Sequence, residues 1–235
     1  MKVSFISLFP DAVLGSVRFS ILSRAEEAGL VEFEAINPRD FAMDQHRTVD
    51  DTPYGGGAGM VLKPDILGAA IESASPVGGC VIMTDPAGSL FRHEDAVELA
   101  LEKRLIIVCG HYEGVDERVA EKYEAKRFSV GDYVLTGGEL AAAVMADAIV
   151  RQLPGVLGSP DSLEQDAFVD GLLTYPQYTR PADWNGIHVP DVLLSGNHGE
   201  IAAWRRKQRL LTTRRRRPDL FSKAPLSKLD LELLQ

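Results

Sequence analysis

The first 150 residues alternate between two hydrophobic patterns, one typical of strands and the other typical of helices. Residues 79–85 and 104–110 are short, continuously apolar runs, as expected of strands that are covered on both faces. Between such runs the apolar residues recur at helical spacing, and one helix start carries Pro64 in its first turn. In chain order we expect strands over residues 2–9, 31–38, 79–85, 104–110 and 126–135, and helices over residues 18–29, 63–74, 93–103, 116–125 and 138–155. This alternation predicts an α/β fold with a mainly parallel sheet and helices on both faces.

The pattern changes after Pro154 and Gly155, which end the last of these helices. The next stretch has no clear period and is rich in Gly, Ser, Pro and Asp, a composition that predicts a mobile linker. Two further helical patterns follow, over residues 197–215 and 227–234. We therefore expect an α/β domain over residues 1–155, a linker over 156–171 and a small helical C-terminal domain over 172–235.

The composition, with 45% hydrophobic and 25% charged residues, is that of an ordinary soluble globular protein. No run of 18 apolar residues could span a membrane, and the apolar part of the first residues, MKVSFISLFPDAV, is too short for a signal peptide. Cys80 and Cys109 each lie inside an apolar run. We expect both to be buried, reduced thiols of a cytoplasmic protein rather than a disulfide, and neither has the spacing partners of a zinc site.

The charge is divided unevenly along the chain. The net charge is −9, but residues 1–150 carry −11 and residues 151–235 carry +2. Residues 204–218, WRRKQRLLTTRRRRP, hold eight basic residues and no acidic one. Such a local positive patch binds phosphate groups whatever the global sign, so it suggests a nucleic-acid partner. The alternative is a basic helix end that is simply solvated.

Three glycine-containing clusters follow predicted strands, at residues 85–88, 109–119 and 131–140. In open α/β sheets this carboxyl edge is where ligands bind. The clusters offer backbone amides and an apolar Tyr-Val-Leu run but no group of Lys or Arg, which suits a neutral ring and a ribose better than a polyphosphate. An adenosine-type ligand such as S-adenosylmethionine fits this chemistry. Neither these clusters nor YGGGAGM (54–60) matches a P-loop or a dinucleotide fingerprint, and the glycines could instead only shape tight turns.

A more specific resemblance extends over almost the whole chain. It is carried by SLFP, PRDF, HRTVDDTPYGGGAGM, GHYEGVDERV, GDYVLTGGEL, LPGVLG, GLLTYPQYTRP and VLLSGNHGEIAAWR. These stretches resemble, in the same order, the signature segments of the bacterial tRNA (guanine-N1)-methyltransferase family of the knotted SPOUT class. The resemblance implies a deep trefoil knot, S-adenosylmethionine held in a bent shape, and a homodimer in which the partner's C-terminal part completes each active site. It also implies that the substrate is the guanine at tRNA position 37, next to the anticodon, when the preceding base is also guanine.

The resemblance assigns the cofactor pocket to residues of the three glycine clusters. They are Pro86, Gly110, Glu113, Val130, Gly131, Asp132, Tyr133, Val134, Leu135, Gly137 and Gly138. Ala141 departs from the family pattern, in which proline often follows GGEL, and makes the rim slightly less rigid.

Methylation of guanine N1 requires the removal of the proton that this nitrogen carries. A base is therefore needed near N1, and a cation near O6 would stabilise the charge that builds there. The family pattern assigns the base to Asp166 and the cation to Arg151. The alternative for Asp166 is that it is one solvated acid among several, as Asp161 and Asp170 would be.

The resemblance also implies contacts to RNA in the C-terminal part. The candidate residues are Tyr178, Arg180, Ser195, Asn197, His198, Arg214 and Arg215. Ser195 or Asn197 could instead only cap a helix, and Gln177 stands where the family often has His. The family uses magnesium, but no carboxylate cluster in the sequence places that ion.

Two other functions remain open from the sequence. One is a knotted methyltransferase that acts on a ribose hydroxyl or on ribosomal RNA, which would need no base for guanine N1. The other is a non-enzymatic RNA-binding module that depends on its basic helix alone and would not need the pocket glycines.

Overall fold

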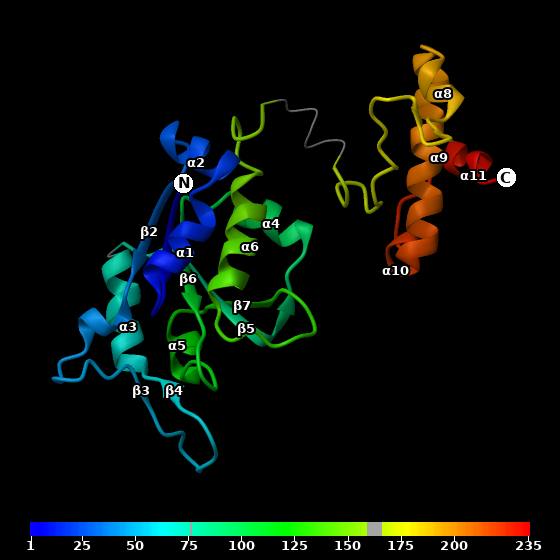
Figure 1. Cartoon of the computed structure of the whole chain (residues 1–235). Helices are drawn as coiled ribbons and strands as arrows, with labels where there is room; N and C mark the ends of the chain where they lie inside the picture. Colours follow the sequence, from blue (N-terminus) through cyan, green and yellow to red (C-terminus); the bar gives the residue numbers. More distant parts are fainter. Residues whose placement is uncertain (76, 159–165) are drawn as a thin grey trace. The chain divides into compact units, whose positions relative to one another are not determined.

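The computed structural model describes residues 1–75, 77–158 and 166–235 (Figure 1). The chain forms two compact units, Met1–Gly158 and Ser159–Gln235. The expected linker over residues 156–171 includes the boundary between them, and its residues 159–165 lie outside the described residues.

The first unit is built on a parallel sheet with the strand order β2-β1-β6-β5-β7. Its strands are β1 (Lys2–Ile6), β2 (Glu32–Ile36), β5 (Cys80–Leu90), β6 (Arg104–Cys109) and β7 (Lys126–Ser129). Every pairing in this sheet is parallel, which confirms the predicted sheet type. The continuously apolar strands β5 and β6 lie inside the sheet, as their composition predicts.

Alternate side chains of the sheet enter two separate cores. On β6, Leu105 and Ile107 point to one face, and Ile106 and Val108 point to the other. The first face is covered by α1 (Pro10–Val17), α2 (Ser20–Glu27), α4 (His93–Leu99) and α6 (Glu139–Val150), and the second by α3 (Pro64–Ala74) and α5 (Glu117–Lys122). The prediction of an α/β fold with helices on both faces is therefore confirmed.

Several predicted boundaries are wrong. The strand expected over residues 2–9 ends at Ile6, and α1 begins at Pro10, whose fixed backbone angle favours the first turn of a helix. The strand expected over residues 126–135 ends at Ser129, because the chain then leaves the sheet. Strand β5 is longer than expected, and its register shifts between Thr84 and Ser89, so that the intervening residues project from the ladder. Three elements were not predicted from the sequence: α1, the 3-10 helix η1 (Pro38–Phe41) and the short hairpin of β3 (Asp50–Asp51) and β4 (Val61–Leu62).

The second unit consists of short elements around one long helix, α9 (His198–Arg216). The others are β8 (Asp183–Trp184), β9 (Ile187–His188), α8 (Asp191–Leu194), α10 (Pro218–Phe221) and α11 (Lys228–Leu233). Helices α9 and α11 confirm the two helices expected over residues 197–215 and 227–234.

Both cysteines are free, as expected, but only Cys109 is fully buried and Cys80 is half-buried. Burial raises the pKa of the Cys109 thiol well above its usual value. Within the described residues, no helix has the length and apolar character needed to cross a membrane.

The buried sheet predicts a sharp contrast between two leucines of the first unit. Leu105 on β6 is fully buried, whereas Leu101, after α4, is 83% exposed. We expect Leu105→Ala to lower the free energy of unfolding by about 2–5 kcal/mol, because it leaves a cavity in the core, and Leu101→Ala to change it by less than about 0.5 kcal/mol. Urea unfolding followed by circular dichroism at one protein concentration measures both. Equal effects of the two substitutions would contradict the assigned core.

Candidate functional site

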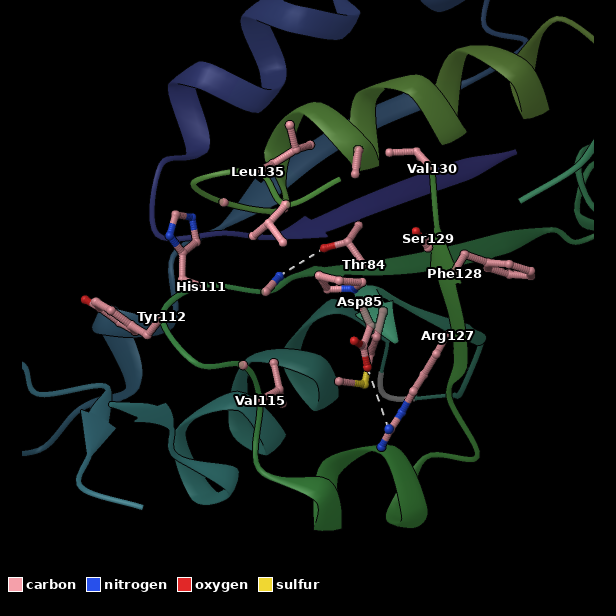
Figure 2. A pocket seen from close by; sticks show the side chains of 18 of the residues that line it. Thr84, Asp85, His111, Tyr112, Val115, Arg127, Phe128, Ser129, Val130 and Leu135 are labelled. Carbon is pink, nitrogen blue, oxygen red and sulfur yellow. Dashed lines mark hydrogen bonds and ion pairs between the residues drawn. The ribbon is translucent and has the colours of Figure 1, made fainter. Parts of the chain in front are cut away.

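A cavity of about 420 Å³ lies beside the ends of β6 and β7 and the register shift of the neighbouring strand β5 (Figure 2). Its walls come from residues 83–86, 110–115, 127–130 and 133–138, together with Glu117 and Ala141. These segments include parts of all three glycine clusters. The prediction that the clusters meet at one edge of the sheet is therefore confirmed.

Most of the residues expected to bind the cofactor line this cavity. They are Pro86, Gly110, Glu113, Val130, Tyr133, Val134, Leu135, Gly137 and Gly138. Gly131 and Asp132 belong to the same loop but do not line the cavity. The Gly131 backbone instead turns against the ring of Tyr133, since a Cβ there would lie 2.4 Å from Tyr133 Cε1.

The innermost part of the site is a crossing of three backbone segments. The Gly138 N–H donates to the Gly110 carbonyl oxygen at 2.8 Å, and the Gly110 N–H donates to Thr84 Oγ1 at 3.0 Å. A Cβ on Gly138 would lie 2.0 Å from Thr84 Oγ1 and 2.9 Å from Cys109 Cα, closer than real contacts allow. Glycine is therefore required here because another backbone passes too closely for any side chain.

A polar cluster that was not predicted from the sequence joins this crossing to the end of β1. The Glu139 carboxylate, at the start of α6, accepts a hydrogen bond from Ser7 Oγ at 2.6 Å and lies 2.8 Å from His111 Nε2. The His111 and Glu139 side chains are both mostly buried. An acid in the first turn of a helix was visible in the sequence, but nothing local pointed to partners 28 and 132 residues away.

The segment 133–137 gives the cavity an apolar wall and polar backbone groups. Tyr133, Val134 and Leu135 are large apolar residues that remain exposed. Within the part of the chain that the structure describes, the N–H groups of residues 134–137 donate to no protein acceptor. A ligand in the cavity would therefore meet both apolar surface and backbone donors.

The charged groups that line the cavity are mostly acidic. They are Asp85, Glu113, Glu117 and Arg127, together with His111. Arg127 forms an ion pair with Asp85 at 3.6 Å (Figure 2). It forms a second ion pair with Glu117. The hydrogen bond to Glu117 raises the pKa of Arg127 above its usual value. This balance disfavours a polyphosphate and is compatible with a ligand that carries positive charge.

The glycine loop 54–60 lies against the loop that carries Glu113. The Glu113 N–H donates to the Met60 carbonyl oxygen at 3.0 Å, and a Cβ on Gly59 would lie 2.2 Å from Glu113 Oε1. Gly59 also has a positive φ of 86°. Glycine at position 59 therefore permits both the close approach of Glu113 and the turn of the loop.

The two proposed catalytic residues lie in different units. Arg151 caps the C-terminus of α6, where its N–H donates to the Asp147 carbonyl oxygen at 3.1 Å, and its side chain is half-buried. Asp166 is the first described residue of the second unit and is also half-buried.

The predicted RNA-contacting residues divide into three groups within the second unit. Tyr178 and Arg180 line a smaller cavity of about 300 Å³, in which the Arg205 guanidinium lies 5.1 Å from the centre of the Tyr175 ring. Asn197 accepts hydrogen bonds from the N–H groups of residues 199 and 200 and thus caps α9, while Ser195 Oγ accepts from the Asn197 N–H. His198, Arg214 and Arg215 are exposed on α9.

Arg217, which follows α9, is paired with an acid. Its Nη2 lies 2.7 Å from Asp219 Oδ2, so it contributes less free positive charge than residues 214–216 do.

Among the described residues there is no group of three or more His, Cys, Asp or Glu side chains that could hold a metal ion. The described residues therefore do not locate a magnesium site.

Comparison with known proteins gives consistent matches over the length of the chain. The family model for tRNA (guanine-1)-methyltransferase TrmD matches residues 1–223. The chain is similar to the tRNA (guanine-N(1)-)-methyltransferase of Geobacter sulfurreducens, with 55% identity over 100% of this chain and 96% of that protein. The proteins of the same name from Geotalea uraniireducens and Dictyoglomus turgidum are 56% and 50% identical, again over 100% of this chain and 96% of each relative.

The backbone crossing predicts an unequal response of two glycines to alanine. Gly138→Ala should lower the melting temperature by at least about 4 °C, because its Cβ would displace the backbone at Cys109 and Gly110. Gly15→Ala, in helix α1 with no atom within 4 Å of the added Cβ, should leave the melting temperature unchanged or raise it. Thermal unfolding followed by circular dichroism measures both. Equal stability of the Gly138→Ala variant and the parent would show that the crossing is looser than described.

Proposed function

The chain belongs to the tRNA (guanine-1)-methyltransferase family, and we propose that it transfers the methyl group of S-adenosylmethionine to N1 of the guanine at tRNA position 37, next to the anticodon. Membership makes the protein an enzyme that methylates guanine N1 in tRNA. The two alternatives left open by the sequence, a different RNA target and a non-enzymatic binding module, are therefore wrong. The full-length match carries this conclusion, and the geometry of the cavity supports the finer assignments.

The cavity at the carboxyl edge fits S-adenosylmethionine in size and chemistry. Its volume of about 420 Å³ lies in the range of small-molecule sites. Leu135 and its neighbours would contact the adenine ring, and the N–H groups of residues 134–137 would donate to its nitrogens. Three carboxylates and one guanidinium line the cavity, a balance that favours a ligand with a sulfonium and an ammonium group.

The bound cofactor would supply a methyl group that is made electrophilic by the positive sulfur. The protein must then free the lone pair of guanine N1. We assign the removal of the N1 proton to the Asp166 carboxylate and the stabilisation of the charge on O6 to the Arg151 guanidinium. With its proton on Asp166, N1 would have a free lone pair to accept the methyl group that S-adenosylmethionine would supply.

The place of Arg151 supports a site shared between two copies of the chain. Gly138, at the start of α6, lines the cavity, whereas Arg151 caps the other end of that helix. At 1.5 Å of rise per residue, the two backbones are roughly 20 Å apart, beyond the reach of an arginine side chain. Arg151 would therefore serve the cavity of a partner subunit. Leu140 and Val144, 61% and 56% exposed on α6, offer an apolar surface for such a homodimer.

The backbone crossing at Gly138 supports the trefoil knot. Gly138 passes against Gly110 and Thr84 so closely that no side chain fits between the segments. A loop drawn tightly around a threaded chain would produce such contacts. We propose that residues 130–138 are this threaded segment and that the tightened loops shape the cofactor cavity.

The second unit would bind the tRNA. Arg214, Arg215 and Arg216 are exposed in the last turn of α9, where they can reach phosphates. Tyr178 and Arg180 border the smaller cavity and could contact the anticodon stem-loop. Because its substrate is tRNA, we place the enzyme in the cytoplasm.

The assignment of the general base predicts a selective loss of chemistry. Asp166→Asn should reduce single-turnover methyl transfer by at least ~10²-fold with both substrates saturating, because an amide does not accept the N1 proton. Binding of S-adenosylmethionine and tRNA should stay within a few-fold of the parent. Rapid-quench measurement of labelled methyl transfer gives the rate, and equilibrium titration gives the two affinities.

Asp191→Asn, at an exposed position in the first turn of α8, is the matched control and should retain the parental rate. Near-parental transfer by Asp166→Asn would show that another group accepts the proton.

The exposed arginines predict a change in salt dependence. Replacing Arg214, Arg215 and Arg216 by Ala should weaken tRNA binding and reduce the slope of log affinity against log salt by roughly one unit for each lost phosphate contact. Arg217→Ala should change the slope less, because that side chain pairs with Asp219. Filter binding over a range of salt concentrations measures the slopes. An unchanged slope in the triple variant would mean that these arginines only face solvent.

A further inference from the structure

The residues that follow Asp166 form a closed turn rather than an open strand of linker. The Phe168 N–H donates to the Leu172 carbonyl oxygen at 2.8 Å, and the Gly171 N–H donates back to the Phe168 carbonyl oxygen at 3.0 Å. Phe168 and Gly171 both have positive φ, 77° and 76°. Leu172 is fully buried. The backbone from residue 168 to residue 172 is thus fixed in shape, two residues away from the proposed base.

Asp170 fastens this turn to α9. Its carboxylate accepts hydrogen bonds from Arg206 Nη1 at 2.6 Å and from Arg209 Nη2 at 2.5 Å. The same side of α9 also holds Leu173, the residue after the turn. Arg209 Nε donates to the Leu173 carbonyl oxygen at 3.2 Å, and the Leu173 N–H donates to Thr213 Oγ1 at 2.9 Å. These contacts recur every three or four residues along one side of α9, so the turn is attached over two helical turns.

Arg206 also pairs with a second carboxylate, that of Asp230. Its Nε and Nη2 donate to Asp230 of α11 at 2.6 Å and 2.8 Å. Arg206 holds the pKa of the buried Asp230 carboxyl far below its usual range, and Asp230 with Asp170 raises the pKa of Arg206. Two of the arginines in the basic stretch, Arg206 and Arg209, are therefore paired with carboxylates inside this unit.

This arrangement corrects the expectation that Asp170 is a solvated acid equivalent to Asp161, a residue that lies outside the described part of the chain. Asp170 has two charged partners 36 and 39 residues away, which no local pattern reveals. Charge-assisted bonds of this kind are shorter and stronger than neutral ones, and Arg209 and Arg206 are only 13% and 29% exposed.

We propose that Asp170 is a positioning residue for methyl transfer: by fixing the turn at residues 168–172 to α9, it sets where Asp166 stands relative to the helix that binds the tRNA. This inference rests on the proposed role of Asp166 as the base. A consequence is that the binding of α9 to RNA also positions the Asp166 carboxylate. When the exposed arginines of α9 fix the helix on the phosphates, the turn carries Asp166 to a defined position.

The test compares two carboxylates that share Arg206. Asp170→Asn keeps the size of the side chain but removes the charge that binds both arginines. We expect its single-turnover rate, with S-adenosylmethionine and tRNA saturating, to fall by at least ~10-fold, in line with the loss of catalytic geometry. The dissociation constants of both substrates should stay within a few-fold. Asp170→Glu, which keeps the charge, should recover part of the rate.

Asp230→Asn is the matched control. It also removes a charged partner of Arg206 and should lower the melting temperature, but it does not touch the turn, so the transfer rate should stay within about two-fold of the parent. Arg209→Ala should reproduce the Asp170→Asn loss, and the double variant should be no slower than either single one. Asp170→Asn placed in an Asp166→Asn background should cause no further loss.

A parental rate for Asp170→Asn would overturn the inference while leaving the role of Asp166 intact. Equal slowing by Asp230→Asn would also overturn it, because the network would then only keep the unit folded. A fully active Asp166→Asn variant would instead overturn the proposed base itself. The three results are separate measurements, so failure of the positioning role and failure of the proposed mechanism are distinguishable.

Discussion

The close passage of the backbone at Gly138 over Gly110 and Thr84 is the constraint on which the rest of the first unit depends. It fixes the start of α6 against Thr84 of β5 and the end of β6, and the cluster of Ser7, His111 and Glu139 then ties the same point to β1. The loop before Gly138 forms a wall of the cavity, and its apolar side chains are exposed. A ligand site made of backbone and glycine needs such tight support, since it has few side chains of its own to hold a ligand in place.

Much of the architecture could be predicted because it depends on local pattern. Continuous apolar runs placed β5 and β6 inside a parallel sheet, and helical spacing gave α3, α9 and α11 with nearly correct bounds. The strand expected through Leu135 was wrong because hydrophobicity has two causes. In Tyr133, Val134 and Leu135 it serves the cavity rather than the sheet, and pattern alone does not separate the two.

The sequence predicted those parts of the site that lie in contiguous motifs. The glycine clusters after predicted strands indicated that three loops share the carboxyl edge, and nine of the residues that the family resemblance assigns to the cofactor line one cavity there. Contacts between distant residues were not predicted, since Glu139 reaches Ser7 and Asp170 reaches Arg206 and Arg209 only through the folded chain. The first unit forms the cavity at the carboxyl edge, and the second unit pairs some of the arginines of α9 with its own carboxylates.

The central claim is that a methyl group passes from S-adenosylmethionine to N1 of guanine 37. The most direct measurement uses a cofactor with a deuterated methyl group and a tRNA transcript that has guanine at positions 36 and 37. After incubation with the enzyme, the RNA is digested and mapped by mass spectrometry. The account predicts deuterated 1-methylguanosine at position 37 and nowhere else. Label on a ribose, on another base or at another position would contradict it, as would a transcript that carries no label.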